Sequence, residues 1–225
     1  MRQYLKSLSS RSEFAIVVLG AFGPFIVSSL LIAAHPGGSP PISNAHLLSL
    51  LIHEPIILIA LCCFLHVRGW TVQRVGLAFG SGLRDGLAGL LLAIAAYAAY
   101  LAAWIIAAEA APEFVRHAGN SQLVTPNLYL GIVIAASLVN PVFEELFVSG
   151  YIISALKTST SAWTAVNVSV AVRLLYHLYQ GSFGVLSVVP IGLIFAWWYA
   201  RTGRLWAVIV AHAMFDFFSL VAYAG

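Results

Sequence analysis

Two adjacent glutamates, Glu144 and Glu145, lie within an otherwise apolar stretch of the sequence, NPVFEELFVSGYI. A charged side chain at the middle of a lipid bilayer costs about 2.5 to 3.5 kcal/mol on insertion scales. Carboxylates that occupy such a position usually face a polar cavity and take part in chemistry or ion transport. The pair therefore marks a candidate functional site, with a carboxylate base or a proton carrier as its chemistry.

Two further pairs of polar residues follow in the C-terminal part of the chain. Arg173 and His177 are four residues apart, and so are His212 and Asp216. Residues four apart share one face of an α-helix, so each pair projects from its helix in one direction. Three neighbouring helices can therefore direct carboxylates, imidazoles and an arginine toward one interior point.

The composition indicates the setting of these residues, because 61% of the chain is hydrophobic and 8% is charged. Apolar stretches recur at the length of about 20 residues that a helix needs to cross a bilayer. A soluble fold is excluded because its helices would be apolar on every side, with almost no polar surface to cover them. We predict an all-α protein, a polytopic transmembrane helix bundle that forms a single integral membrane domain over residues 1–225.

The apolar stretches predict about seven spans, with eight as the alternative count, separated by segments rich in Gly, Pro, Ser and Asn. The spans cover residues 14–34, 45–67, 86–108, 128–156, 161–179, 183–200 and 205–223. Because the apolar region of the first span is long and six spans follow, we expect it to be retained rather than cleaved as a signal peptide. Cys62 and Cys63 point about 100° apart on a helix, so we expect packing residues rather than a disulfide.

The basic residues predict the orientation of the bundle, because cytoplasmic loops attract lysine and arginine. With a cytoplasmic N-terminus, Arg116 falls on the outer side. Nine basic residues fall on the cytoplasmic side: Arg2, Lys6, Arg11, Arg68, Arg74, Arg84, Lys157, Arg201 and Arg204. The net charge of +3 then reflects this orientation and contact with the anionic lipid of the bilayer, and we expect no nucleic-acid partner.

Three ordered segments carry a resemblance to a known family: FEELFVSGYIISAL, RLLYHLYQG and IFAWWYARTGRLWAVIVAHAMFDFF. They resemble the CPBP family, the CAAX protease and bacteriocin-processing (Abi) group of intramembrane endopeptidases, whose pattern is EExxxR, then FxxxH, then HxxxN or HxxxD. The resemblance covers about residues 137–220, which we predict to be the catalytic core. A fourth segment, FLHVRGWTVQRVGL, is a weaker match and resembles the RxRGW segment that these proteins often carry upstream.

The resemblance implies a role for each residue of the site. Glu144 matches the catalytic base that activates a water, and His177 matches the residue that holds and polarises this water. His212 and Asp216 match positions that stabilise the oxyanion, and Glu145 completes the predicted catalytic set. The resemblance further implies a glutamic intramembrane protease without a metal or other cofactor. We expect it to act on a membrane-anchored or lipid-modified peptide or protein in a bacterial inner membrane.

The chain departs from the family pattern at three positions. Ser149 stands where the motif has an arginine that neutralises the second glutamate, and Arg173 stands where it has an aromatic residue. A lone arginine within a span requires a carboxylate partner, so we predict that Arg173 neutralises Glu145 from the next helix. Asp216 stands where asparagine is often found. An ionised aspartate cannot donate a hydrogen bond to an oxyanion, so we expect Asp216 to orient His212 or to be protonated.

Three other interpretations of the same residues stay open. Two histidines with a glutamate and an aspartate are acceptable zinc ligands, so a metalloprotease is one of them, although HExxH is absent. A proton-coupled transporter is the second, because buried carboxylates and histidines also form proton relays, although no internal repeat is visible. The third is a catalytically inactive membrane partner such as a bacteriocin self-immunity protein, of which Ser149 would be the mark.

Two expectations concern depth and a further carboxylate. His212 lies about 7 residues from the cytoplasmic end of its span and His177 about 16 residues from the start of its own, a difference in height of roughly 14 Å at 1.5 Å per residue. Helix tilt, a late start of the 161–179 span or a break near Pro141 would absorb it. Glu54 could support the site as a carboxylate behind the catalytic groups, but we expect it rather to be a structural hydrogen-bonded group or to lie near the outer interface.

Overall fold

The computed structural model describes residues 2–35, 41–78, 82–119 and 123–225. Its helices are α1 (Arg2–Ser7), α2 (Ser10–Ala33), α3 (Asn44–Val67), α4 (Gly82–Ala110), α5 (Pro112–Gly119), α6 (Leu130–Glu145), η1 (Leu146–Tyr151), α7 (Ile152–Leu156), α8 (Ala162–His177), η2 (Leu178–Gln180), α9 (Gly181–Thr202) and α10 (Leu205–Val221). Among the described residues there is no β-strand, only two isolated bridges. The predicted all-α class is confirmed.

The predicted spans each correspond to a helix or to a continuous helical run. Five segments are long and apolar enough to cross a membrane, and the shorter α10 is also apolar. The fifth of these, Ala162–Thr202, contains both α8 and α9. The chain reverses between these two helices at η2 and at Gly181, whose φ is 58°. The fourth, Leu130–Leu156, runs through α6, η1 and α7 without interruption. The polytopic helical bundle expected from the apolar stretches is therefore present.

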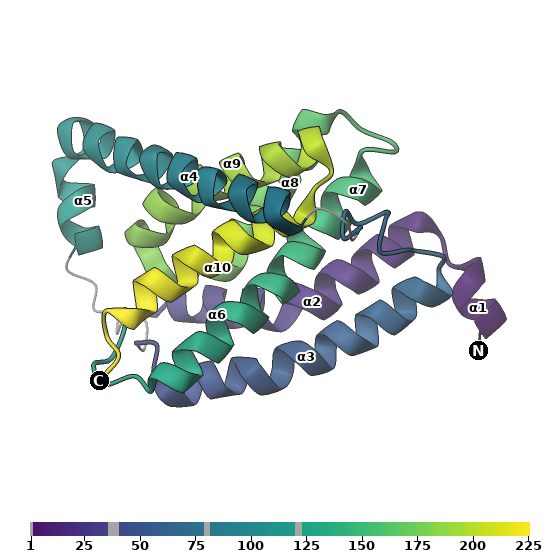
Figure 1. Cartoon of the computed structure of the whole chain (residues 1–225), viewed down its shortest axis with the longest axis horizontal. Coiled ribbons are helices and arrows are strands. Elements are labelled where there is room, and N and C mark those ends of the chain that lie inside the picture. The colour runs from purple at the N-terminus through teal and green to yellow at the C-terminus, as the bar shows by residue number, and fades with distance from the viewer. Residues whose placement is uncertain (1, 36–40, 79–81, 120–122) are drawn as a thin grey trace.

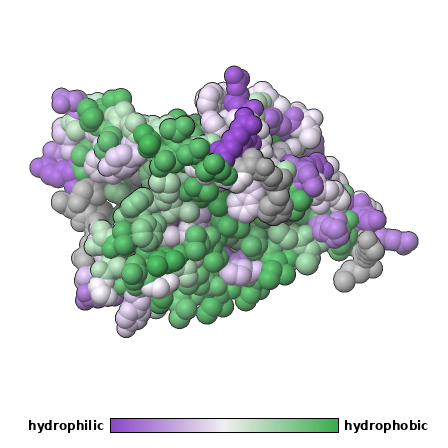
Figure 2. Space-filling view, in the orientation of Figure 1, coloured by the Kyte–Doolittle hydropathy of each residue, from purple (hydrophilic) through white to green (hydrophobic). Residues whose placement is uncertain are grey.

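The helices form a bundle whose surface is mainly apolar. Figure 1 shows α4, α10, α6 and α3 following one another across one face, with α2, α8 and α9 behind them. Many large apolar side chains are exposed, such as Leu19, Leu91 and Ile106 at 64%, 67% and 67%. Figure 2 shows apolar residues over the middle of this face and hydrophilic residues toward its ends. A surface of this kind is stable in the hydrocarbon of a bilayer rather than in water.

One end of the bundle holds most of the basic residues, and we call it the basic end. Here Arg68, just after α3, donates to Glu13 of α2 at 2.6 Å and to backbone carbonyls of α1 and the following turn. Lys157 after α7 donates to the carbonyl of Ala200 in α9 at 2.6 Å. Arg204 before α10 pairs with Asp85 of α4. These contacts bring the starts of α2, α4 and α10 to the same end as the last residues of α3, α7 and α9.

The opposite end, which we call the far end, is joined by backbone contacts between segments distant in sequence. Ile42 bridges to Val124, and Leu128 bridges to Ala224. The side chain of Asn44 donates to the carbonyl of Asn127 and accepts from the N–H of Tyr129, just before α6. The start of α3, the start of α6 and the end of α10 therefore meet here. The cytoplasmic location of the basic end, and so of the N-terminus, stays a prediction.

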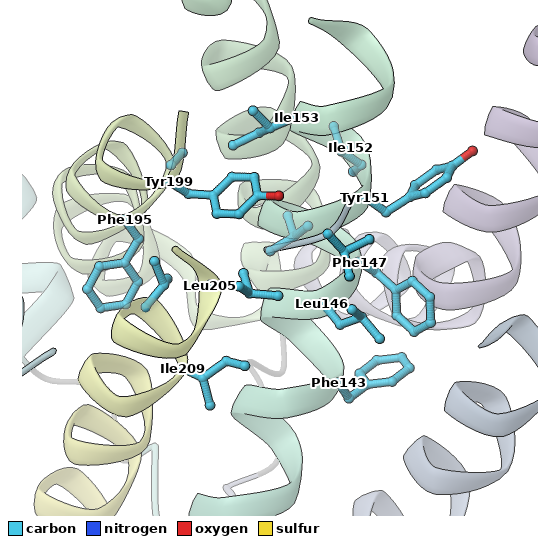
Figure 3. Close-up of a cluster of buried hydrophobic side chains, with 14 of the residues drawn as sticks. Phe143, Leu146, Phe147, Tyr151, Ile152, Ile153, Phe195, Tyr199, Leu205 and Ile209 are labelled. Atoms are coloured by element: carbon cyan, nitrogen blue, oxygen red, sulfur yellow. The ribbon is translucent and has the colours of Figure 1, made fainter. Parts of the chain in front are cut away.

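The core packs the helical run that contains the glutamate pair between α9 and α10 on one side and α2 on the other. Figure 3 shows Tyr199 of α9 and Leu205 of α10 on one side of this run, and Phe147 of η1 directed to its other side. On the other side the ring of Phe143 meets that of Phe22 in α2, with centroids 6.0 Å apart. Close packing on both sides fixes the depth and rotation of the run that carries the two glutamates.

The difference in height that simple spans predict between His177 and His212 is removed by the deep start of α10. This cause was not among those considered from the sequence. Leu205, the first residue of α10, is fully buried, and its backbone N–H donates to the carbonyl of Gly76 at 3.1 Å. Residues 70–77 therefore fold beneath the start of α10, with Trp70 and Val75 each 6% exposed. Because α10 begins inside the bundle, His212 lies at the depth of Glu145 after only two turns.

Candidate active site

The glutamate pair lies where α6 changes into a π-helical turn. The α-helix ends at Glu145, and residues Leu146–Tyr151 form η1, all of them buried. A π-helical turn is a wide turn that appears frequently at functional sites. In it the hydroxyl of Ser149 donates to Glu145 Oε2 at 2.6 Å. Ser149, where the family pattern has arginine, is thus a direct hydrogen-bond partner of the second glutamate.

Glu145 is fully buried and surrounded by donors. Arg173 Nη2 lies 2.7 Å from Glu145 Oε1 and 2.8 Å from Oε2, and His212 Nδ1 lies 2.7 Å from Oε1. Together with the Ser149 hydroxyl, these contacts saturate the carboxylate, and the guanidinium balances its charge in a fully buried position. The predicted contact between Arg173 and Glu145 is present. Glu145 is therefore a point at which α6, α8 and α10 are joined.

Glu144 points in a different direction, as neighbours on a helix must. Its Oε2 accepts a hydrogen bond from the hydroxyl of Tyr176 at 2.6 Å and lies 3.6 Å from Arg173 Nη1. Its Oε1 receives only a long contact of 3.4 Å from Asn140 Nδ2. Glu144 borders a cavity and Glu145 does not. The two carboxylates therefore have separate surroundings, one saturated and enclosed, the other with an oxygen available to a ligand.

The cavity has a volume of about 370 Å³ and lies between α2, α3, α6, α10 and the end of α8. The polar and charged side chains in its wall are Ser28, Ser29, His46, Glu54, Asn140, Glu144, Tyr176, His177, Tyr179, Gln180, His212, Asp216 and Ser219. A polar cavity needs about 10 to 15 Å³ to hold one water molecule. This one has room for water together with a segment of peptide.

His177 presents one free nitrogen to this cavity. Its Nδ1 lies 2.9 Å from the carbonyl oxygen of Arg173. A carbonyl can only accept, so Nδ1 carries a proton, and in the neutral ring Nε2 is the acceptor. The ring also packs on Tyr176, with centroids 4.5 Å apart. Both contacts hold the imidazole in the orientation that a water-positioning group requires.

His212 lies between two carboxylates. Besides its contact with Glu145, its Nε2 is 3.4 Å from Oδ1 of Asp216, one turn further along α10. Asp216 is within reach of His212, as the expected orienting role requires, and it also borders the cavity. The Asp216 side chain is 26% exposed against 11% for His212, so it is the more accessible of the two.

The comparison with protein families agrees with this geometry. Residues 126–218 match the family model described as type II CAAX prenyl endopeptidase Rce1-like. The resemblance to the CAAX proteases is confirmed for this part of the chain, and the matched model describes endopeptidases. No curated protein and no solved structure gives a significant match to the chain.

The family segment contains every predicted site residue, but part of the cavity wall comes from outside it. Glu54 of α3 is 2% exposed and accepts a hydrogen bond from Asn140 Nδ2 at 2.9 Å. The same amide contacts Glu144, so Asn140 links the two carboxyl groups. The second oxygen of Glu54, Oε2, has no hydrogen-bond partner among the described residues. Glu54 is hydrogen-bonded, as expected, but it lies in the cavity wall rather than near the outer interface, because α3 packs on α6 at this depth.

The sequence contained weak signals for the residues that were missed. Asn140 lies four residues before Glu144 and therefore on the same helix face. Tyr176 directly precedes His177, and a tyrosine hydroxyl in a buried position needs a partner. Glu54 is a carboxylate at mid-length of an apolar span, which is by itself a sign of function.

The metalloprotease alternative requires three or four ligands around one point. In the described part of the chain no three His, Cys, Asp or Glu side chains are arranged in this way. His212 is held by Glu145 and Asp216, whereas His177 Nδ1 is committed to a carbonyl oxygen. A zinc site at these residues would need these contacts to be broken and the side chains to be reoriented.

Proposed function

We propose that this protein is an intramembrane endopeptidase that hydrolyses a peptide bond of a membrane-anchored or lipid-modified substrate with a water activated by Glu144. One observation carries the proposal. Glu144 Oε1 and His177 Nε2 are the two weakly engaged acceptor atoms at the deep end of one cavity, while their other atoms are held by Tyr176, Arg173 and backbone. Two acceptors beside one cavity can hold a water by its two hydrogens.

In the proposed reaction, the water oxygen attacks the carbonyl carbon of the scissile peptide bond while Glu144 Oε1 takes one of its protons. The Tyr176 hydroxyl and Arg173 hold Oε2, which fixes the carboxylate so that Oε1 faces the water. When the C–N bond breaks, Glu144 returns the proton to the leaving nitrogen. The products are a carboxylic acid and an amine, and Glu144 is regenerated.

The negative charge that develops on the carbonyl oxygen needs a donor. His212 in its doubly protonated form donates from Nδ1 to Glu145 and has Nε2 directed toward the cavity side, near Asp216. An N–H held in place before the reaction stabilises an oxyanion without the cost of reorganisation. His212 is then held in its protonated form by Glu145 and Asp216, and Arg173 acts through Glu145. These three residues do not contact the substrate.

The experiment is cleavage of a library of membrane-anchored peptides by the purified protein, with and without a chelator. Wild type is compared with Glu144→Gln and with Glu109→Gln, which removes an exposed carboxylate at the end of α4 and serves as the matched control. We expect cleavage by wild type and Glu109→Gln in chelator, and none by Glu144→Gln. Loss of cleavage in chelator would instead support the metalloprotease. No cleavage by folded wild type would favour the inactive partner or the transporter.

A further inference from the structure

The cavity of the active site is open toward one end of the bundle. In α2, which runs away from the basic end, the lining residues extend from Phe22 to Ile32, in the later part of the helix. In α3, which runs toward the basic end, they lie between His46 and Glu54, in the earlier part of the helix. Both ranges begin at mid-depth and reach the far end. No lining residue comes from the halves of these two helices near the basic end.

The lining residues of α10 also lie toward the far end. In α10, which starts at the basic end, the lining residues lie between His212 and Leu220. Exposed lining residues, Ser28 and His46, occur nearer the far end, whereas Glu54 and Glu144 at mid-depth are 2% and 7% exposed; other lining residues near the far end, such as Leu47, are buried. The catalytic groups thus form the floor of the cavity, and its mouth lies at the far end.

The basic end is closed beneath this floor. Residues 70–77 fold under the start of α10, and Trp70 donates from Nε1 to Glu13 at 2.8 Å while its ring packs on Tyr151. Trp70, Tyr151 and Leu205 are 6%, 1% and 0% exposed. A peptide that approaches from the basic end therefore meets close-packed side chains rather than an opening.

The charge distribution assigns a side of the membrane to each end. Of the 11 lysines and arginines, nine lie at the basic end, Arg116 lies at the far end in α5, and Arg173 lies within the bundle. Short loops rich in lysine and arginine stay in the cytoplasm. The basic end is then cytoplasmic, and the mouth of the cavity faces the other side of the membrane.

From these observations we propose that the protein receives its substrate from the non-cytoplasmic side. The substrate would be a membrane-anchored peptide segment whose scissile bond reaches the floor of the cavity from the outer side, not a protein tail confined to the cytoplasm. The substrate class rests on the proposed peptidase function. The direction of access rests only on the cavity and on the charges, and it is testable without any substrate.

The test is labelling of single cysteines with a membrane-impermeant thiol reagent in intact cells. The background replaces the two native cysteines, Cys62→Ser and Cys63→Ser, which are exposed residues of α3. Two probes report the cavity, His46→Cys at its mouth and Leu50→Cys deeper in its wall. Thr158→Cys, an exposed residue after α7, is the matched control at the basic end.

We expect His46→Cys and Leu50→Cys to be labelled from outside intact cells, and Thr158→Cys only after the membrane is permeabilised. Labelling of Thr158→Cys from outside, with the cavity probes protected, would overturn the proposal. So would protection of Leu50→Cys from both sides while His46→Cys reacts, because the cavity would then be closed. Ser219→Cys, a cavity residue of α10, replaces either probe if its variant does not fold. If labelling is as expected but the protein cleaves no peptide, the peptidase function fails and the orientation stands.

Discussion

Removing the guanidinium of Arg173 tests the network that joins α6, α8 and α10. Arg173→Met leaves the carboxylate of Glu145 fully buried with two donors, His212 and Ser149, and without its arginine. Removing one partner of a buried ion pair costs about 3 to 5 kcal/mol, because a buried charge is left without compensation. A domain of 150 to 250 residues loses about 2 to 4 °C in Tm per kcal/mol. We therefore expect a fall in Tm of about 6 to 20 °C.

The assay is thermal unfolding of the detergent-solubilised protein for a double-mutant cycle of Arg173→Met and Glu145→Gln. The double variant removes both charges, so we expect its loss of stability to be smaller than the sum of the two single losses by about 1 to 3 kcal/mol. The control pair is Arg116→Met and Glu113→Gln on α5, a contact between largely exposed side chains that is worth less than about 1 kcal/mol.

Two results would contradict a stabilising pair of Arg173 and Glu145, and a third would disqualify the assay. Additivity of the two single losses within about 0.5 kcal/mol would show that Arg173 and Glu145 do not stabilise each other. A single Arg173→Met variant as stable as wild type would show that the carboxylate is not charged in the folded protein, or that water reaches it. Equal losses at the exposed control pair would show that the assay reports general damage rather than the buried contact.

Three further predictions concern the cavity wall and the substrate. Tyr176→Phe removes the 2.6 Å hydrogen bond to Glu144, so kcat should fall about 10- to 100-fold, whereas an unchanged kcat would exclude Tyr176 as a positioning group. Glu54→Gln should keep most of the activity, because its amide oxygen still accepts a hydrogen bond from Asn140. In Glu54→Leu this acceptor is lost, so kcat measured in steady state should fall about tenfold or more. Among the described residues, the cavity wall has three carboxyl groups and no lysine or arginine. Acidic residues beside the scissile bond should therefore lower kcat/KM in a matched peptide series.

The sequence was sufficient for the helices and for the charge pairing, for physical reasons that act locally. An apolar run of bilayer length must form a helix, because lipid offers no partner to its backbone groups. Arg173 within such a run needs a carboxylate, and Glu145 is the nearby one without an arginine in its own motif. The spacing of four residues predicted that His177 and His212 point toward one interior region, and both line the cavity. These inferences need no knowledge of how distant segments pack.

What the sequence did not predict depends on long-range packing. The contribution of α3 to the cavity requires α3 to lie against α6. The hydrophobic pattern of the sequence does not predict which helices are neighbours. The depth of α10 depends on residues 70–77 folding beneath Leu205. Cys62 and Cys63 were expected to pack but are exposed, since lipid tails are as apolar as a core and composition cannot separate the two environments.

The catalytic role of Glu144 is the central claim, and its most direct test is single-turnover cleavage of one membrane-anchored peptide by wild type and Glu144→Gln. We expect the rate constant to fall about 10²- to 10⁴-fold, because the general base is lost, while the peptide still binds and the Tm stays close to that of wild type. A folded Glu144→Gln variant that cleaves within about tenfold of the wild-type rate would contradict it.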